Sequence, residues 1–194
     1  MHHIYHTHGF ILGSRNMGEA NKMLSIYTRE MGLIRCAAQG VRLNKSKLRF
    51  ALQDFSYVKV DLVRGRDLWR VTSASNINSF SYARRDKQSI LLIARISKLI
   101  ERLCDGEESN EKIFDDFIQS LYLMDDEQIS IEKREALELH LVLRIMNTLG
   151  YVGESDILGE YLSLPFEKIK VESLLRERKS IIAYINKAMS ESGL

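Results

Sequence analysis

The stretch FSYVKVDLV, residues 55–63, decides how the first part of the chain folds. Polar or half-polar side chains alternate there with apolar ones, namely Tyr57, Lys59 and Asp61 against Val58, Val60 and Leu62. A period of two places all the apolar side chains on one face of an extended strand. The stretch therefore predicts a half-buried β-strand.

Four further short apolar runs, each bounded by turn signals, flank this strand in the sequence: residues 9–14, 22–28, 33–41 and 68–77. Residues 29–32 (REMG) and 64–67 (RGRD) are typical of hairpin connections. The helical spacing of Leu48, Ala51 and Leu52 predicts a short helix before the fourth strand. Five short strands predict a small barrel or a sandwich.

Beyond residue 86 the apolar spacing changes to three and four, which predicts helices over residues 87–103, 110–124, 130–150, 155–164 and 170–192. Asn110 and Ser155 are candidate N-caps, and Gly150 is a candidate C-cap. Ser130 and Lys133 begin the long helix that Gly150 ends. We expect an α+β protein, with a five-stranded barrel in residues 1–82 and an all-α helical domain in residues 83–194.

The formal net charge of +2 hides an asymmetry between the two parts of the chain. Residues 1–85 hold 14 Lys and Arg against 5 Asp and Glu, whereas residues 86–194 hold 14 against 21. No acid occurs between Glu30 and Asp54. Phosphate backbones are common partners of a basic surface, although two solvated surfaces of opposite sign would give the same counts.

An oligonucleotide/oligosaccharide-binding (OB) fold is a five-stranded barrel that binds single strands, with cations for phosphates and aromatic rings for bases. The candidate cations are Arg35, Arg42, Lys45, Lys47 and Arg49 before the fourth strand, and Arg64, Arg66 and Arg70 around the next turn. Tyr27, Tyr57 and Trp69 are candidate stacking residues. The alternative for Tyr57 and Trp69 is that they close the barrel.

Catalytic motifs such as GxSxG, HExxH, a P-loop and GxGxxG do not occur in the sequence. The adjacent carboxylates Asp115–Asp116 and Asp125–Asp126 would point about 100° apart on a helix, so each pair cannot converge on one substrate bond. We expect them on solvated helix faces, and no enzyme activity is indicated.

Four of the five histidines lie near the N-terminus, at His2, His3, His6 and His8. On a strand, His6 and His8 would share one face, with His2 as a third candidate, and imidazoles on one face suit a transition metal, but no local carboxylate or thiol completes the set. We therefore favour the polar face of an exposed first strand, and we predict no metal site. His140 lies among apolar residues and is interpreted as a helix-surface or core histidine.

Two widely separated cysteines, Cys36 and Cys104, support neither a disulfide framework nor a cysteine-rich zinc site. A reduced, cytoplasmic setting is the expectation. No stretch approaches the roughly 20 apolar residues of a membrane span, and the N-terminus does not resemble a signal peptide.

Residues 9–56 resemble the N-terminal domain of the RecO recombination mediators. The matching features are Arg15, the pair Gly18-Glu19, the Gly32 turn, residues 38–42 (AQGVR) and residues 52–55 (LQDF). Further matches are the Met23-Leu24 and Tyr27-Thr28 pairs, residues 64–80 as the closing hairpin, and residues 144–154 (RIMNTLGYVGE) at the end of a long helix.

The resemblance implies an OB fold packed on a helical domain, without enzyme activity or a cofactor. It implies binding of single- and double-stranded DNA, annealing of complementary strands, and loading of recombinase onto DNA coated with single-stranded-DNA-binding protein (SSB). The implied partners are RecR and the acidic C-terminal tail of SSB, in the cytoplasm and at the nucleoid. Within the OB fold, Lys45, Lys47 and Arg49 would face phosphates, while Leu48, Phe50, Ala51 and Leu52 would fill the barrel end.

The sequence departs from the family pattern at several positions. Many members carry four cysteines after the Gly-Tyr pair, but residues 152–155 here contain none, so zinc is not expected. Asp54 stands where proline is usual, and Ala20-Asn21 replaces a common acidic residue. The helical part is short, so we expect its partner surfaces to be altered.

Two other functions are compatible with the sequence. A protein-interaction scaffold would use apolar helical residues such as Ile181, Ile182 and Ile185, unless these pack inside the domain. An RNA-binding OB protein is the nearest rival to a DNA-binding one.

Overall fold

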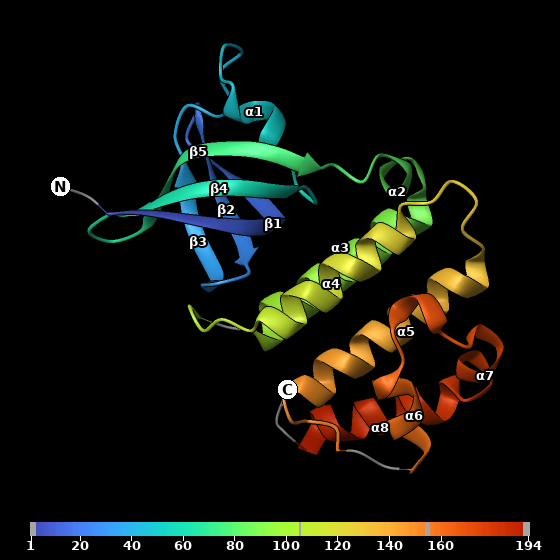
Figure 1. The fold of residues 1–194 in the computed structure, drawn as a ribbon. Coiled ribbons are helices and arrows are strands. Elements are labelled where there is room, and N and C mark those ends of the chain that lie inside the picture. The colour runs from blue at the N-terminus through green and yellow to red at the C-terminus, as the bar shows by residue number, and fades with distance from the viewer. Residues whose placement is uncertain (1–2, 105, 154–155, 192–194) are drawn as a thin grey trace. The chain divides into compact units, whose positions relative to one another are not determined.

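The computed structural model describes residues 3–104, 106–153 and 156–191 (Figure 1). The chain divides into two compact units, Met1–Phe114 and Asp115–Leu194. The first unit therefore contains the strands and the helices that immediately follow them. The predicted limit between residues 82 and 83 falls inside α2 (Ser81–Arg85), just after the last strand, and the domain limits 1–82 and 83–194 stay a prediction.

Five strands close into a barrel in the order β1–β2–β3–β5–β4 (Figure 1). They are β1 (Ile4–Met17), β2 (Asn21–Thr28), β3 (Gly32–Ala38), β4 (Tyr57–Arg64) and β5 (Trp69–Asn78). β3 and β5 pair in parallel, and the other neighbours are antiparallel. Because long β1 pairs with both β2 and β4, the sheet has no free edge. The predicted fold class, an OB-like barrel followed by helices, is confirmed.

Buried and exposed side chains alternate along β4, as the sequence pattern of residues 55–63 predicts. Val58, Val60 and Leu62 are fully buried in the barrel core, whereas Lys59 is exposed and Asp61 is partly exposed. Each strand contributes apolar side chains to this core in the same way. Burial of one face fixes the register of each strand, since a slip by one residue would turn its apolar side chains toward water.

The short helix α1 (Leu48–Ala51) lies at one end of the barrel (Figure 1). Leu48 packs against the core, and Ala51 and Leu52 are buried. Phe50 is 73% exposed, so the prediction that it fills the barrel end is wrong. At about 100° per residue, Phe50 points roughly 200° away from Leu48, toward water.

A helix that the sequence pattern does not predict, α2 (Ser81–Arg85), follows the barrel. The Arg84 guanidinium donates hydrogen bonds to the carbonyl oxygens of Ser79 and Asp54. It also donates to Oγ of Ser56 at 2.9 Å. Arg84 thereby fastens α2 to the residues that lead into β4.

The remaining helices agree largely with the predicted ranges. They are α3 (Lys87–Leu103), α4 (Glu111–Met124), α5 (Ile131–Thr148), α6 (Asp156–Ser163), α7 (Val171–Arg176) and α8 (Arg178–Glu191), with a short 3-10 helix η1 (Phe166–Lys168). Asn110 Oδ1 accepts from the Ile113 N–H at 3.1 Å, which confirms this predicted cap. Ser130 Oγ accepts from the Lys133 N–H at 3.1 Å, so Ser130 caps the helix that it is predicted to begin. Ser155 lies outside the described residues.

The C-terminal region differs from the single predicted helix over residues 170–192. Two helices, α7 and α8, meet at Glu177, whose N–H donates a hydrogen bond to the Ser173 carbonyl oxygen at 3.2 Å. The apolar spacing runs across this break, because Leu174, Ile181 and Ile185 are all buried in the second unit, Asp115–Leu194, called the helical unit from here on. Periodicity therefore could not reveal it.

The helical unit contains a buried ion pair between Asp116 and Arg144, although Asp116 is predicted to lie on a solvated helix face. Asp116 is 7% exposed, and its two oxygens accept from Nε and Nη2 of Arg144 at 2.8 and 2.7 Å. Arg144 also lies over the Phe166 ring, 5.1 Å from its centroid. The expectation of a solvated face is wrong for Asp116 and holds for exposed Asp115. In the described ranges, no helix is long and apolar enough to cross a membrane.

Candidate nucleic-acid interface

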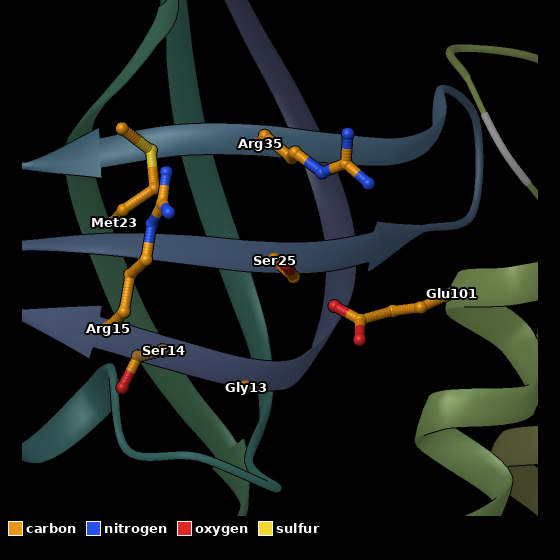
Figure 2. Close-up of a pocket in the computed structure, with 7 residues that line it drawn as sticks. All are labelled: Gly13, Ser14, Arg15, Met23, Ser25, Arg35 and Glu101. Atoms are coloured by element: carbon orange, nitrogen blue, oxygen red, sulfur yellow. The ribbon is translucent and has the colours of Figure 1, made fainter.

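A groove of about 530 Å³ lies on the outer face of β1, β2 and β3 (Figure 2). Its lining residues are Gly13, Ser14, Arg15, Met23, Ser25, Arg35 and Glu101. Six of them come from the three strands, and Glu101 reaches toward them from α3. The β2–β3 face is the surface on which OB folds bind oligonucleotides.

Strand register explains both the hollow and its charge. Gly13, Ser25 and Arg35 are cross-strand neighbours on β1, β2 and β3. Glycine and serine have small side chains, so they leave a shallow floor beside the long arginine. Arg15 stands two residues further along β1, on the same face, opposite Met23. Two guanidinium groups thus flank a small-residue floor, as Figure 2 shows.

The groove continues toward the turn between β4 and β5. A second cavity of about 350 Å³ shares Arg15, Met23 and Arg35 with the first and adds Asp67 and Leu68 of that turn. The L45 loop, which this turn represents, belongs to the ligand surface of OB folds. The combined groove therefore joins the β2–β3 face to the region of Arg64 and Arg66.

The groove is not purely cationic. Arg15 and Arg35 are exposed, and Glu101 is partly exposed. Among the described residues, no ion pair joins Glu101 to either arginine. The two guanidinium groups are therefore available to an anionic ligand, and the nearby carboxylate weakens the attraction.

The predicted cations before the fourth strand continue from β3 into α1: three of them lie on the β3–α1 loop, and Arg49 lies in α1 itself. Arg42, Lys45, Lys47 and Arg49 are all exposed. Arg42 is bonded to the β1–β2 turn, through its N–H to the Ala20 carbonyl oxygen at 2.9 Å and through Nη1 to that of Gly18 at 2.8 Å. Arg42 thus attaches the loop to the barrel, while Lys45 and Lys47 are exposed to water.

The predicted cations of the β4–β5 turn have mixed surroundings. Arg64 pairs with Glu107 at 3.3 Å and lies 5.4 Å from the centre of the Trp69 ring. Arg66 is exposed and Arg70 is partly buried. Of the eight predicted cations, Arg64 alone pairs with a carboxylate within the part of the chain described by the structure. The Glu107 carboxylate therefore offsets the positive charge that Arg64 presents to solvent.

The predicted stacking residues are less accessible than the cations. Trp69 is 5% exposed, lies in the barrel core and donates from Nε1 to Glu107 Oε1 at 2.8 Å. Tyr27 is fully buried, and burial raises its pKa above the ordinary value. Tyr57 is partly buried beside Phe114, with ring centres 6.1 Å apart. The alternative that Trp69 closes the barrel agrees with its burial.

Sequence reasoning did not single out Arg15, Ser25 and Glu101 as members of one site. Arg15 is visible as a family motif residue, but its proximity to Arg35 depends on pairing across three strands. Glu101 arrives from α3, far along the chain. Periodicity can place each residue on a face, but it cannot show which faces meet.

The histidines of β1 are spread along the strand. His6 Nδ1 lies 2.6 Å from Asp61 Oδ1 on β4, and the His8 ring contacts Tyr57 at 6.0 Å between centres. His2 lies outside the described residues, as do Glu154 and Ser155 of the segment for which the sequence predicts no zinc site. The described residues contain no group of three histidine, cysteine or acidic side chains close enough to hold a metal ion. Cys36 and Cys104 are both free.

A closed five-stranded barrel with a groove on its β2–β3 face defines an OB-fold protein. Residues 1–80 match the family described as "Recombination protein O N terminal", and residues 84–153 match "Recombination protein O C terminal". The chain belongs to the RecO family.

Curated relatives agree with this assignment. The DNA repair protein RecO of Clostridium perfringens is 31% identical over 187 residues, which cover 93% of this chain and 74% of that protein. The DNA repair protein RecO of Alkaliphilus metalliredigens is 34% identical over 137 residues, covering 70% of this chain and 56% of that protein. The DNA repair protein RecO of Pelotomaculum thermopropionicum is 32% identical over 111 residues, which cover 57% of this chain and 43% of that protein. The chain thus spans about half the length of several curated relatives.

Proposed function

We propose that this chain is a non-catalytic DNA-binding protein of recombinational repair. It binds single- and double-stranded DNA, anneals complementary strands and helps to load recombinase onto SSB-coated DNA. The observation that carries the proposal is the groove between Arg15 and Arg35 on the ligand face of an OB barrel in a RecO-family chain. Exposed Lys45 and Lys47 on the β3–α1 loop, and exposed Arg49 in α1, supply further cations of the barrel unit.

The physical basis is the neutralisation of phosphates. Each lysine or arginine that contacts a phosphate releases condensed counterions, which favours binding at low salt regardless of sequence. Annealing needs two strands whose mutual repulsion is screened while their bases stay free to pair. A cationic surface that holds backbones meets this requirement without making or breaking a covalent bond.

The first prediction concerns the loop cations. The triple variant Lys45→Glu, Lys47→Glu, Arg49→Glu should weaken binding of single strands of every sequence alike. If each wild-type cation contacts one phosphate, the slope of log affinity against log salt should decrease in magnitude by about 2. Fluorescence anisotropy with labelled oligonucleotides between low and moderate salt measures both quantities.

A matched control reverses three exposed lysines of the helical unit, Lys168, Lys179 and Lys187. This control changes the net charge of the protein by the same amount, and we expect it to retain most of the affinity. Equal losses in both variants would mean that net charge and not the loop governs binding. Salt-insensitive or absent binding by the unaltered protein would refute the proposed function.

RecR and the acidic tail of SSB are proposed as partners because the chain belongs to the RecO family. Pull-down with each protein, using SSB with and without its last residues, tests this part of the proposal. Competition between DNA and RNA strands of equal length tests the RNA-binding alternative. An annealing assay on SSB-coated complementary strands tests the complete activity.

A further inference from the structure

Phe50 is the most exposed of the large apolar side chains described by the structure, at 73%. An aromatic ring that stays in water forgoes the free energy that its burial would contribute. One exposed apolar residue is nevertheless common on protein surfaces and would need no explanation by itself. Its neighbours make it unusual. Lys47 and Arg49 are exposed beside it in the sequence, and Leu43 in the same loop is 45% exposed.

The backbone holds Phe50 outward. Leu48, Ala51 and Leu52 face the barrel, and the Leu52 N–H donates to the Leu48 carbonyl oxygen at 2.9 Å. This hydrogen bond completes the single turn of α1. Because the opposite side of the turn is buried, Phe50 cannot enter the core without unfolding α1.

The loop before α1 is built from successive turns. The Leu43 N–H donates to the Gly40 carbonyl oxygen at 3.1 Å, and the Ser46 N–H donates to that of Leu43 at 3.0 Å. Arg49 Nη1 donates to Asn44 Oδ1 at 3.0 Å. These bonds limit the freedom of the loop. The cations and the Phe50 ring are therefore held in one arrangement, and the loop loses less conformational entropy when a ligand binds.

We infer that Phe50 stacks on an unpaired base of single-stranded DNA while Lys45, Lys47 and Arg49 hold the adjoining phosphates. This inference rests on the proposed function and adds a base-contacting residue to it. A single-stranded polyanion matches the patch because it presents apolar ring faces and negative charges alternately along one chain. Duplex DNA keeps its bases stacked inside, so Phe50 should contribute to single-strand binding alone.

The test compares Phe50→Ala with the unaltered protein on three ligands of equal length: oligothymidylate, the same strand with abasic sites, and duplex DNA. We expect Phe50→Ala to lower the affinity for oligothymidylate about fivefold or more. Affinity for the abasic strand and for duplex should not change. The salt slope should also stay the same, because stacking releases no counterions.

Two control variants accompany this test. Phe50→Tyr keeps the ring and should keep the affinity for oligothymidylate. Ile77→Ala removes another exposed apolar side chain, 43% exposed on β5, and should have no effect. Thermal unfolding should be unchanged in both Phe50 variants, since this side chain is 73% exposed.

The outcomes separate the inference from the proposed function. If Phe50→Ala binds oligothymidylate normally while reversal of the loop cations weakens it, the inference is wrong and the proposed function stands. An equal loss on the thymidylate and abasic strands also overturns it, because the ring would then contact no base. If the unaltered protein binds none of the three ligands, the proposed function fails. Binding of an acidic peptide that depends on Phe50, without an effect on strands, would assign the patch to a protein partner instead.

Discussion

At the scale of single residues, the candidate interface depends on side chains whose neighbours come from other strands. Arg35 is open to an anionic ligand because Ser25 and Gly13 beside it are small and leave a hollow. Glu101 opposes that attraction from α3 (Figure 2). The balance between two cations and one carboxylate should therefore set the affinity of the groove.

The variant Glu101→Gln tests this balance. Removing a negative charge from the groove should strengthen single-strand binding about two- to fivefold at low salt, because an unfavourable charge–phosphate interaction is lost. Anisotropy titrations at two salt concentrations measure the change, which should shrink as salt rises. Glu172→Gln, an exposed carboxylate of α7, is the matched control. Unchanged or weaker binding by Glu101→Gln would mean that single-stranded DNA binds outside the groove.

At the scale of elements, His140 fastens α5 to α6. Its Nε2–H donates to the Tyr161 carbonyl oxygen at 2.8 Å, and its ring packs 4.8 Å from that of Phe166. The side chain is 1% exposed. Burial lowers its pKa from 6.5 to about 4, and nearby Arg144 acts in the same direction. His140 is thus a core histidine, one of the two alternatives that the sequence left open.

This pKa shift predicts how stability depends on pH. Between about pH 6.5 and pH 4 the unfolded chain holds a proton on His140 that the folded chain lacks, so the free energy of unfolding should fall as pH falls. The total loss attributable to His140 is roughly 3 kcal/mol. Urea unfolding of the unaltered protein and of His140→Leu at several pH values measures it. Identical pH dependence in both proteins would contradict the prediction.

At the scale of the whole molecule, two compact units each have a core of their own. The barrel contains the single tryptophan of the chain, Trp69. The second unit is helical, and the Asp116–Arg144 pair lies in its interior. Tryptophan fluorescence therefore reports on the barrel, and far-UV circular dichroism is dominated by the helices.

The variant Asp116→Ala should destabilise the helical unit by about 3 kcal/mol, because it leaves the Arg144 charge without its carboxylate in a buried site. Thermal unfolding followed by circular dichroism should shift to lower temperature, while the Trp69 fluorescence transition should stay in place. Glu127→Ala, which removes an exposed carboxylate of the same unit, is the control and should change neither transition. A matching shift of the fluorescence transition would show that the barrel depends on this pair.

The sequence determined the parts of this protein that depend on local periodicity and on capping. Alternation over residues 55–63 gave β4, and the spacing of three and four gave α3, α4 and α5. Asn110 and Ser130 marked helix starts because their side chains satisfy free N–H groups. The density of cations before β4 was equally visible, since charge is a property of composition.

Tertiary structure alone decided which of these residues meet. The groove forms because β1, β2 and β3 pair in one register, which brings Arg15 and Arg35 together across β2. Likewise, Asp116 is buried because α5 presents Arg144 to it, and Phe50 is exposed because one turn of α1 cannot bury all its sides. Periodicity constrains the direction of a side chain relative to its own backbone. Contact between distant segments depends on how their faces pack, and no short stretch of sequence contains that information.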